Sequence, residues 1–489
     1  MNTMKKTISA ALALLITASA TAACGESADM PTDTTVMQTD PAPETEAETT
    51  ADHLSELPDD DQGGRTFTIV AQHTSERFNF PYEEKTGDVI NDSILERDNA
   101  VEERLNIVIN RIGYEDRGKL KTEVQKTILA GDSAYDLIIT SMSDGINTLG
   151  PAGTLYDLNG LPYVDLTAEW WNRSIHEDMQ LLGHQLFTTG AISPCYYLTP
   201  IVMIFNKRLA EDYGFTDLYG AVYDGQWYFD KFISMVDGIS YDLDSNGKMD
   251  YEDFYGFSSD TTLGNALYAT AGLAPVKNEG GVYTLDIDSQ RSIDVIMKYA
   301  GVFSDKTKYI IQESGSDKVT NVFKTGRAVF SALNIYGFAV PYRDMDDDYG
   351  VLPLPKYNES DADYLVTCNT WLPTGVAVPI TCTDPEFVGL VMETLAYTSY
   401  LTVGPAVYET ALRGKATRDS ESYEMLEFIF RSIVFDFNTV FNFGGSSELL
   451  RAAVCGLKPN FVSDYEKIKP KAQKALDDMI QLVSENYGG

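Results

Sequence analysis

The 489-residue sequence is poor in histidine and in basic residues. It has four histidines and no CxxC pair, so a zinc site is not expected. Lys and Arg number 37 against 73 Asp and Glu, which gives a formal net charge of −36. Nucleic-acid binding depends on clustered cations that neutralise phosphates. The composition therefore excludes nucleic acid as a partner.

Motifs of several common catalytic sites are also missing. The sequence contains no GxSxG elbow, no HExxH pair and no GxxxxGK[ST] phosphate loop. A glycoside hydrolase needs only two carboxylates across a cleft, so that class stays open in so acidic a chain. We therefore expect a protein that is not an enzyme. A surface glycan-degrading enzyme and a surface receptor without a transport role remain the alternatives.

Cysteines are few beyond the N-terminal region. They stand at Cys195, Cys368, Cys382 and Cys455. An exported protein reaches an oxidising compartment, where disulfides form. These four residues are therefore either disulfide-bonded or buried free thiols, and the sequence does not choose between the two.

The first 24 residues have the layout of an export signal. Lys5 and Lys6 precede an uncharged stretch that is too short and too rich in small residues for a spanning helix. Cys24 follows Thr21, Ala22 and Ala23, and this end resembles the bacterial lipobox, although that motif usually has Leu where Thr21 stands. The resemblance implies that residues 1–23 are a cleaved signal peptide. A lipid on Cys24 would then anchor an extracytoplasmic protein to the cell membrane.

Residues 24–64 are predicted to be a lipidated cysteine followed by a disordered acidic tether. Positions 25–64 contain no Lys or Arg and twelve Asp or Glu. Such a segment buries too little apolar surface to fold, and charge repulsion with proline keeps it extended. No later hydrophobic stretch has the length of a spanning helix.

The body from residue 65 onward is long enough for two domains. Runs rich in β-branched residues at 66–72, 106–112 and 135–140 predict strands, and the spacing over 88–105 and 119–130 predicts helices. Alternation of strands and helices is typical of an α/β fold with a largely parallel sheet.

Five segments of the body occur in an order known from one family. They are Ile201–Leu209 (IVMIFNKRL), Gly225–Phe232 (GQWYFDKF), the acidic loop from Asp242, Phe323–Phe330 (FKTGRAVF) and Gly350–Pro355 (GVLPLP). Together they resemble the extracellular solute-binding proteins of ABC importers. The resemblance is closest to the family associated with oligosaccharide and oligopeptide uptake in Firmicutes-type bacteria.

This resemblance implies a two-lobed α/β fold of the periplasmic-binding-protein type (type II), with a ligand cleft between the lobes and hinge crossings. Residues 65–158 with 322–380 would form lobe 1, and residues 159–321 with 381–489 would form lobe 2. The implied function is capture of a small solute for an ABC permease, with an oligosaccharide favoured and a peptide as the other possibility. A monomer is expected.

Aromatic side chains with polar neighbours are the candidates for ligand contact. Sugar rings pack on flat aromatic surfaces, whereas their hydroxyls need amides or carboxylates nearby. The predicted ligand residues are Trp371, Tyr336, Trp171, Trp170, Tyr196, Asn334, Asn369 and Asp144. Core packing is the alternative for each aromatic, because large rings dominate protein cores. Trp227 is expected to be structural.

The acidic run from 242 to 253 has the spacing of a calcium-binding loop. Oxygen-bearing side chains fall at positions 1, 3, 5 and 9, a glycine falls at position 6, and position 7 offers its backbone carbonyl. Position 12 is an Asp where the usual motif has a Glu. The predicted ligands of a structural calcium ion are Asp242, Asp244, Asn246, Lys248, Asp250 and Asp253. A solvated acidic turn is the alternative.

Overall fold

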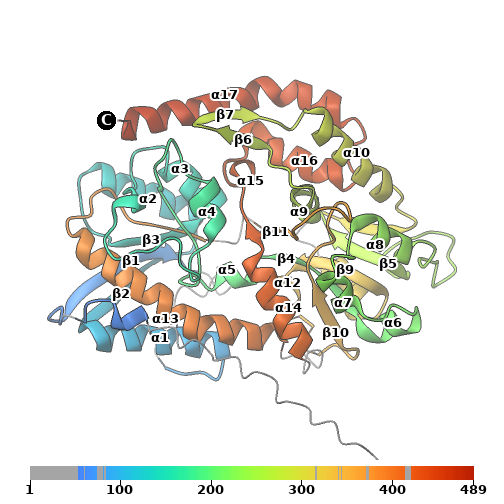
Figure 1. The fold of residues 1–489 in the computed structure, drawn as a ribbon, viewed down its shortest axis with the longest axis horizontal. Helices are drawn as coiled ribbons and strands as arrows, with labels where there is room; N and C mark the ends of the chain where they lie inside the picture. The colour runs from blue at the N-terminus through green and yellow to red at the C-terminus, as the bar shows by residue number, and fades with distance from the viewer. Residues whose placement is uncertain are drawn as a thin grey trace, which may run out of the picture. The chain divides into compact units, whose positions relative to one another are not determined.

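Two β-sheets and the helices around them form the described part of the chain (Figure 1). The structure is a computed structural model that describes residues 53–59, 61–73, 81, 84–313, 317–339, 341–342, 344–369, 374–412 and 420–488. The longer helices are α1 (Val89–Leu105), α2 (Arg117–Leu129), α8 (Phe229–Val236), α9 (Leu263–Thr270), α10 (Gln290–Phe303), α11 (Asp317–Lys324), α13 (Pro385–Leu412), α14 (Ser420–Arg431), α16 (Ser446–Val454) and α17 (Phe461–Tyr487).

Short helical segments connect these elements. They are α3 (Asn147–Leu149), α4 (Arg173–Asp178), α5 (Cys195–Leu198), α6 (Lys207–Asp212), α7 (Leu218–Tyr223), α12 (Tyr336–Ala339) and α15 (Phe437–Phe441), with the single turns η1 (His53–Ser55), η2 (Met142–Ile146), η3 (Leu158–Gly160) and η4 (Phe443–Gly445).

The first sheet has four strands in the order β12-β3-β1-β2. These strands are β1 (Arg65–Gln72), β2 (Ile107–Tyr114), β3 (Leu137–Ser141) and β12 (Thr374–Ala377). β1 pairs parallel with β2 and β3, whereas β12 pairs antiparallel with β3. The strands and helices predicted for this part of the chain are therefore confirmed, with ends shifted by at most two residues.

Alternating residues of β1 enter two different hydrophobic layers. Phe67 and Ile69 pack into a cluster that contains Val101 of α1 and several residues of α13. Val70 lies in the other cluster, together with Val124 of α2. Successive side chains of a strand point to opposite faces, so α1 and α13 cover one face and α2 the other. The strand is buried on both faces, as expected for parallel β-structure.

The second sheet has five strands in the order β10-β4-β9-β5-β8. These strands are β4 (Ile201–Asn206), β5 (Tyr255–Asp260), β8 (Tyr309–Gln312), β9 (Ala328–Asn334) and β10 (Tyr349–Leu352). β9 pairs parallel with β5 and antiparallel with β4. Trp227 is fully buried beside this sheet, and its indole N–H donates to the carbonyl of Pro353 at 2.9 Å. The prediction that Trp227 is structural is confirmed.

Two small ribbons complete the pairing. β6 (Val276–Glu279) and β7 (Val282–Leu285) form a hairpin whose turn residues, Gly280 and Gly281, have φ values of +63° and +88°. Two positive φ values at the tip of a two-residue hairpin favour glycine. β11 (Val366–Thr367) and β13 (Ile433–Val434) pair in parallel where the chain passes between the two larger sheets.

The sheets divide the chain differently from the predicted lobe boundaries. β9 and β10 lie in the second sheet, although residues 322–380 were assigned to lobe 1. The stretch from Leu158 to Ile192 and helix α13 pack instead against the first sheet. Hydrophobic periodicity identifies a strand but does not identify the sheet that the strand joins, so the sequence misplaced these segments.

The end of the predicted tether also differs. The prediction of disorder extended to residue 64, but η1 and the residues after it pack on the body. Leu57 is buried, and the Arg104 side chain donates to the carbonyls of Leu54 and Leu57. The backbone N–H groups of Gln62 and Gly64 donate to carbonyls at the end of α1. Cys24 and the rest of the predicted tether lie outside the described residues.

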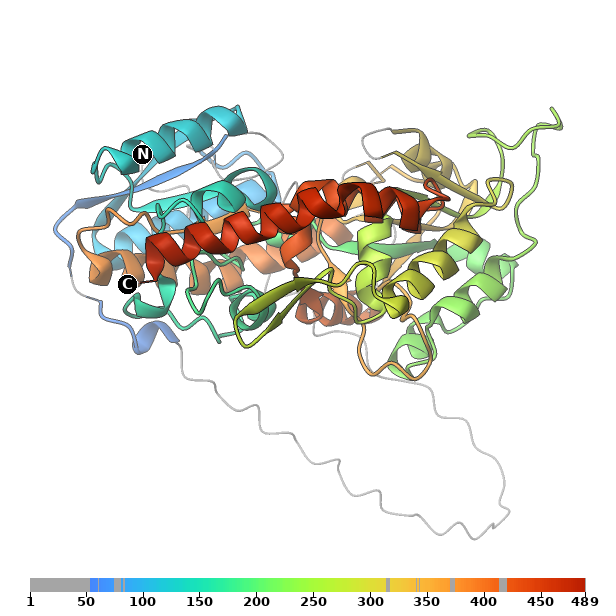
Figure 2. The ribbon, with the colours of Figure 1, turned by 90° about the horizontal axis from the view of Figure 1, so that it is seen from above.

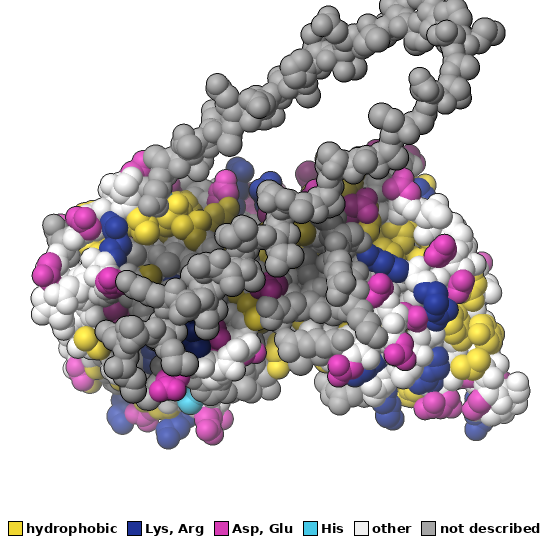
Figure 3. Space-filling view, turned by 90° about the horizontal axis from the view of Figure 1, so that it is seen from below, with side chains coloured by type: hydrophobic (Ala, Val, Ile, Leu, Met, Phe, Trp, Pro, Cys, Tyr) yellow, Lys and Arg dark blue, Asp and Glu magenta, His cyan; other side chains and the backbone are white. Residues whose placement is uncertain are grey.

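Acidic side chains are spread among basic ones on the face seen in Figure 3 rather than gathered in one patch. Within the described ranges, no helix combines the length and apolar character needed to cross a membrane.

Candidate functional site

A polar pocket lies where segments of both sheets meet the C-terminal helices. It encloses about 540 Å³, including space that is open to solvent. It is lined by Ser143, Ile201, Thr262, Asn265, Cys368, Asn369, Thr439, Asn442, Ser447, Glu448 and Arg451. Ser143 follows β3 of the first sheet, and Ile201 begins β4 of the second. The remaining residues belong to α9, α15 and α16, to the capping positions of these helices, or to the chain after β11.

Neutral hydrogen-bonding groups dominate the lining. Asn442 donates from Nδ2 to Glu448 Oε1 at 2.8 Å, and Asn265 donates from Nδ2 to Ser447 Oγ at 3.0 Å. The Oδ1 atom of Asn265 is buried without a hydrogen-bond partner in the described structure. A buried acceptor of this kind costs free energy until a donor reaches it. The pocket therefore offers an acceptor to a ligand that carries O–H or N–H groups.

One cation and one carboxylate accompany these groups. The guanidinium of Arg451 makes neither a hydrogen bond nor an ion pair with any described residue, whereas Glu448 already accepts from Asn442. Arg451 and Glu448 stand three residues apart on α16, on the same side of the helix. Together they can bind a ligand that both donates and accepts hydrogen bonds, as a hydroxyl group does.

A thiol in the lining is not set up as a nucleophile. Burial raises the pKa of Cys368 to about 12, so the thiol stays protonated at neutral pH. The thiolate is the reactive form of cysteine. Cys195, Cys382 and Cys455 are also free, which resolves the choice left open by the sequence in favour of free thiols.

Two of the predicted ligand residues lie at or beside this pocket. Asn369 is part of the lining. Asp144 follows Ser143, but its carboxylate is bound by the Lys121 ammonium at 2.9 Å. Their contact with a ligand stays a prediction.

The tryptophan pair lies elsewhere, around one buried carboxylate. The indole N–H groups of Trp170 and Trp171 donate to the two oxygens of Glu393, each at 2.9 Å. The Nε2 atom of His53 lies 3.2 Å from the same side chain, which is fully buried. Burial raises the pKa of Glu393 above its ordinary value. In this structure the two indoles therefore join α13 to the preceding chain, and neither lines the polar pocket.

The remaining described candidates are not among the lining residues, although Asn334 on β9 pairs with the lining residue Ile201 on β4. Tyr196 is buried, and its hydroxyl accepts from Asn172 Nδ2 at 3.3 Å. Asn334 accepts the N–H of Gly337 at the end of β9, and Tyr336 is half-buried against the core. Trp371 lies outside the described residues.

Sequence reasoning missed most of the pocket. The overlooked residues are short polar side chains on α9, α15 and α16, such as Thr262, Asn265 and Ser447. Such residues are common on solvated helix faces, so nothing in their spacing marked them. Their meeting point depends on how α16 packs against α9, which only the tertiary structure supplies.

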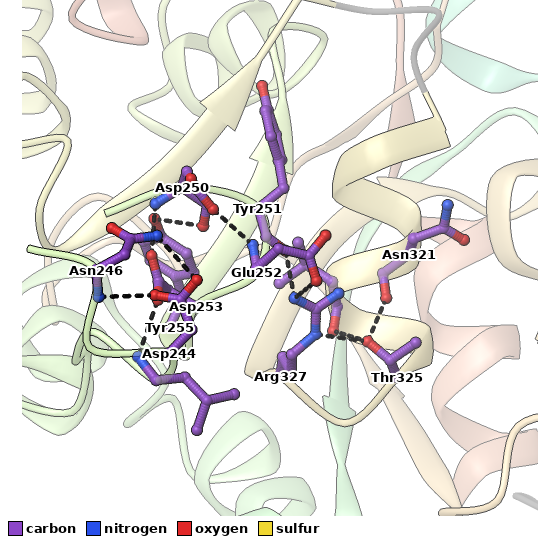
Figure 4. A network of polar contacts seen from close by, with 12 residues as sticks. Asp244, Asn246, Asp250, Tyr251, Glu252, Asp253, Tyr255, Asn321, Thr325 and Arg327 are labelled. Atoms are coloured by element: carbon purple, nitrogen blue, oxygen red, sulfur yellow. Dashed lines mark hydrogen bonds and ion pairs between the residues drawn. The ribbon is translucent and has the colours of Figure 1, made fainter. Parts of the chain in front are cut away.

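The acidic loop brings three carboxylates together, and two of them, Asp244 and Asp253, are labelled in Figure 4. Oxygens of Asp242, Asp244 and Asp253 lie within 4.8 Å of one another, and Asp253 is fully buried. The N–H of Gly247 donates to Asp242 at 2.7 Å, and this hydrogen bond lowers the pKa of Asp242. The N–H of Leu243 donates to Asp253 at 2.9 Å.

The side chain at position 12 of the loop is an Asp, which is shorter than the usual Glu, and its location in the fold compensates for the shorter reach. Asp253 lies two residues before β5, close enough for one oxygen to join the other two carboxylates. Gly247 has a φ of +82° at the sharp turn, as position 6 of such loops requires. The residues present therefore fit a hard cation that prefers oxygen ligands.

No protein-family model matches the sequence, and the comparison with curated proteins also finds no match. Solved structures do match. A cyclo/maltodextrin-binding protein complexed with maltotetraose gives a TM-score of 0.55 at 13% identity, with 87% of this chain and 98% of that chain covered. UgpB from Mycobacterium tuberculosis, in complex with glycerophosphocholine, gives a TM-score of 0.53 at 12% identity, with 86% and 99% covered. The predicted fold class is confirmed: the chain has the α/β fold of these binding proteins.

Proposed function

We propose that this chain captures a small polar solute outside the cytoplasm, with an oligosaccharide as the favoured class, and delivers it to the permease of an ABC importer. The observation that carries this proposal is the polar pocket, whose lining combines amides and hydroxyls from segments of both sheets. Ligand sites are typically concave and sit between domains, where closure encloses the solute. Proteins that share the fold bind solutes such as maltotetraose.

Binding without catalysis accounts for the described lining better than hydrolysis does. A glycosidase places two carboxylates on opposite sides of the scissile bond. Glu448 is the one carboxylate among the described lining residues, and the Cys368 thiol is held protonated. The described part of the lining also includes no histidine that could serve as a general base.

Calorimetry on the full chain tests this function. We expect saturable binding of an oligosaccharide such as maltotetraose, weaker binding of tetra-alanine, and no product by mass analysis. Replacing Asn265 or Asn369 by Ala should weaken binding roughly tenfold, since each loses about one hydrogen bond. Asn110→Ala, at an exposed position on β2, is the matched control and should leave affinity unchanged. Release of shorter sugars would contradict a pure binding function.

We propose in addition that Cys24 carries a lipid that holds the protein at the membrane. The support is the sequence around Cys24, which resembles a lipobox after an export signal. Labelled palmitate should enter the wild-type chain in cells and should not enter Cys24→Ser. Labelling of the Ser variant would contradict lipidation at this position.

We also propose that the acidic loop holds a structural calcium ion. Asp242, Asp244 and Asp253 supply converging carboxylate oxygens, and Asn246, Asp250 and the backbone carbonyl of Lys248 complete a donor set of the kind calcium prefers. When bound, the ion would neutralise carboxylates that otherwise repel one another. It would stabilise the segment that leads into β5.

Chelation tests the calcium site. The melting temperature of the full chain should fall when EDTA replaces calcium, because an ion that binds only the folded state stabilises it. Asp244→Asn should reduce this difference, whereas Asp224→Asn, outside the loop, should keep it. A melting temperature that is equal with calcium and with EDTA would contradict the proposal.

A further inference from the structure

A second cavity lies beside the hairpin β6–β7, and none of its described lining residues belongs to the polar pocket. It encloses about 1290 Å³, including space that is open to solvent. Its walls come from α4, from the chain between α9 and β6, from the paired strands β11 and β13, and from the start of α15. Figure 1 shows the hairpin close to α15 and beneath α17.

The inner wall of this cavity is apolar. Val276, Phe435 and Phe437 line it, and each is at least nine-tenths buried. Leu273 and Leu365 line it as well. Aromatic and aliphatic walls of this kind bind the hydrocarbon part of a ligand.

The rim is acidic, and two of its carboxylates are uncompensated. Glu279 of β6 and Asp178 of α4 have no hydrogen bond or ion pair from their side chains to any described residue. The rim cation Lys277 is already bound to Asp286 at 2.8 Å. Burial of the Asp178 carboxyl is the main cause of its raised pKa, and the negative charge of the neighbouring Glu177 raises it further. A cation bound at the rim would pair with these carboxylates and would favour their charged form.

A buried hydroxyl supplies an independent sign of a missing partner. Thr367 of β11 lines the cavity and is 6% exposed. Its Oγ1 atom is buried and makes no hydrogen bond within the described chain. Buried hydroxyls are nearly always hydrogen-bonded in native proteins, so this one is available to a bound molecule.

The hairpin beside the cavity is held to the chain that follows α4. The Tyr283 hydroxyl on β7 donates to the carbonyl of Gln180 at 2.8 Å and accepts the N–H of Leu182 at 3.0 Å. The Tyr283 ring packs edge-on against Phe437, with 5.4 Å between ring centres and 89° between planes. The hairpin therefore stays in place without a ligand.

We propose that this cavity binds a small organic cation with an apolar body, such as an arylalkyl ammonium ion. The hydrocarbon part packs on Phe435, Phe437 and Val276, and the ammonium group lies at the rim near Asp178 and Glu279. Because the wall includes β11 and β13, which connect the two sheets, an occupant contacts both halves of the protein. This site is separate from the pocket proposed for the captured solute.

Calorimetry on the full chain with 2-phenylethylammonium tests the site. We expect saturable binding at least tenfold tighter than binding of the neutral 2-phenylethanol, the anionic 3-phenylpropanoate or the short methylammonium ion. Asp178→Asn combined with Glu279→Gln should weaken the cation at least tenfold. Both positions are exposed, so the double variant should fold. Thr367→Val should weaken binding several-fold, and Glu103→Gln on the exposed face of α1 should not change it.

Each contrary result overturns the proposal. Absence of saturable binding would show that the cavity is not a site for this cation. Equal binding of 2-phenylethanol would contradict a role for charge. Equal binding of methylammonium would contradict a role for the apolar wall. A crystal structure of the complex with 2-(4-bromophenyl)ethylammonium locates the ligand by the anomalous scattering of its bromine atom. Bromine beside Phe435 and Phe437 supports the assignment, and bromine elsewhere overturns it.

Discussion

Glu393 illustrates how one buried carboxylate can organise its surroundings. Both of its oxygens accept indole N–H groups, from Trp170 and Trp171. Glu393→Gln keeps one acceptor but turns an amide N–H₂ toward the second indole. We expect a loss of about 1–3 kcal/mol in unfolding free energy, the usual cost of a buried donor without an acceptor. Urea unfolding of the variant measures it.

The control for this substitution lies on the same helix. Glu386→Gln, exposed in the first turn of α13, should change stability by less than about 0.5 kcal/mol. The pH dependence gives a second readout. Because the folded-state pKa of Glu393 is raised above 4.5, the wild type should lose stability relative to the Gln variant as pH rises past that value. A difference that grows with pH would contradict the assignment.

The cysteines allow a prediction about reactivity. Burial raises the pKa of Cys368 and of Cys455 to about 12, and Cys195 is also buried. Cys382 is half-exposed, although burial raises its pKa too. With a chromogenic disulfide reagent at pH 8, Cys382 should react first, and the buried three should react only after denaturant is added. Rapid release of several equivalents from the native body would contradict this order.

At the scale of helices, the contact between α9 and α16 depends on a glycine. A Cβ at Gly264 would lie 2.2 Å from the backbone oxygen of Arg451. Gly264→Ala should therefore push the helices apart, cost about 1–3 kcal/mol and weaken ligand binding, since α16 carries Arg451 into the polar pocket. Denaturant titration and calorimetry measure the two effects.

A matched glycine on another helix gives the opposite expectation. A Cβ at Gly301 in α10 would meet no atom within 4 Å. Gly301→Ala should stabilise the protein by about 0.5–1 kcal/mol, because Ala loses less conformational freedom in a helix. If Gly264→Ala stabilised the protein to the same extent, the contact between α9 and α16 would not depend on the glycine.

The three parallel strands of the first sheet and the two helices between them were predictable because each one carries a local signal, whereas β12 was not predicted. Residues 66–72 are rich in β-branched residues, and Asp88 and Asp116 cap the following helices by accepting N–H groups three residues on. No local feature of the sequence indicates which sheet β9 joins. Its partners β4 and β5 lie far away in the sequence, so its place is fixed by long-range packing.

At the scale of the whole body, α17 connects the two halves. Its first half packs against α16 and η4, while near its end Tyr487 accepts the N–H of Leu155 and donates to the carbonyl of Gly150, each at 3.1 Å. Figure 2 shows the helix running across both groups of elements. The C-terminal turn therefore fixes the chain around α3 to elements of the second sheet.

Tyr487→Phe tests this connection. The variant leaves the Leu155 N–H without its acceptor, so we expect a loss of about 1–3 kcal/mol and faster hydrogen exchange at that amide. Tyr423→Phe, at an exposed position on α14, is the control and should change neither quantity. Unchanged exchange at Leu155 in Tyr487→Phe would contradict the role given to α17.

The candidate site was less predictable than the fold. Asn369 was foreseen because it precedes a tryptophan in the chain, whereas Asn265 and Arg451 meet only through helix packing. The acidic loop is the exception, since all of its proposed ligands lie within twelve consecutive positions and its geometry is therefore local.

If Cys24 carries the proposed lipid, a pull from the membrane would reach the body through the segment that ends at Gly64. From His53 onward this segment is held by the Arg104 side chain, by the end of α1 and by Glu393 on α13. A pulling force on the N-terminal end would therefore enter through α1, α13 and the first sheet, and would bypass β11 and β13. The strands β11 and β13, which lie between the two sheets, would then carry little of this load.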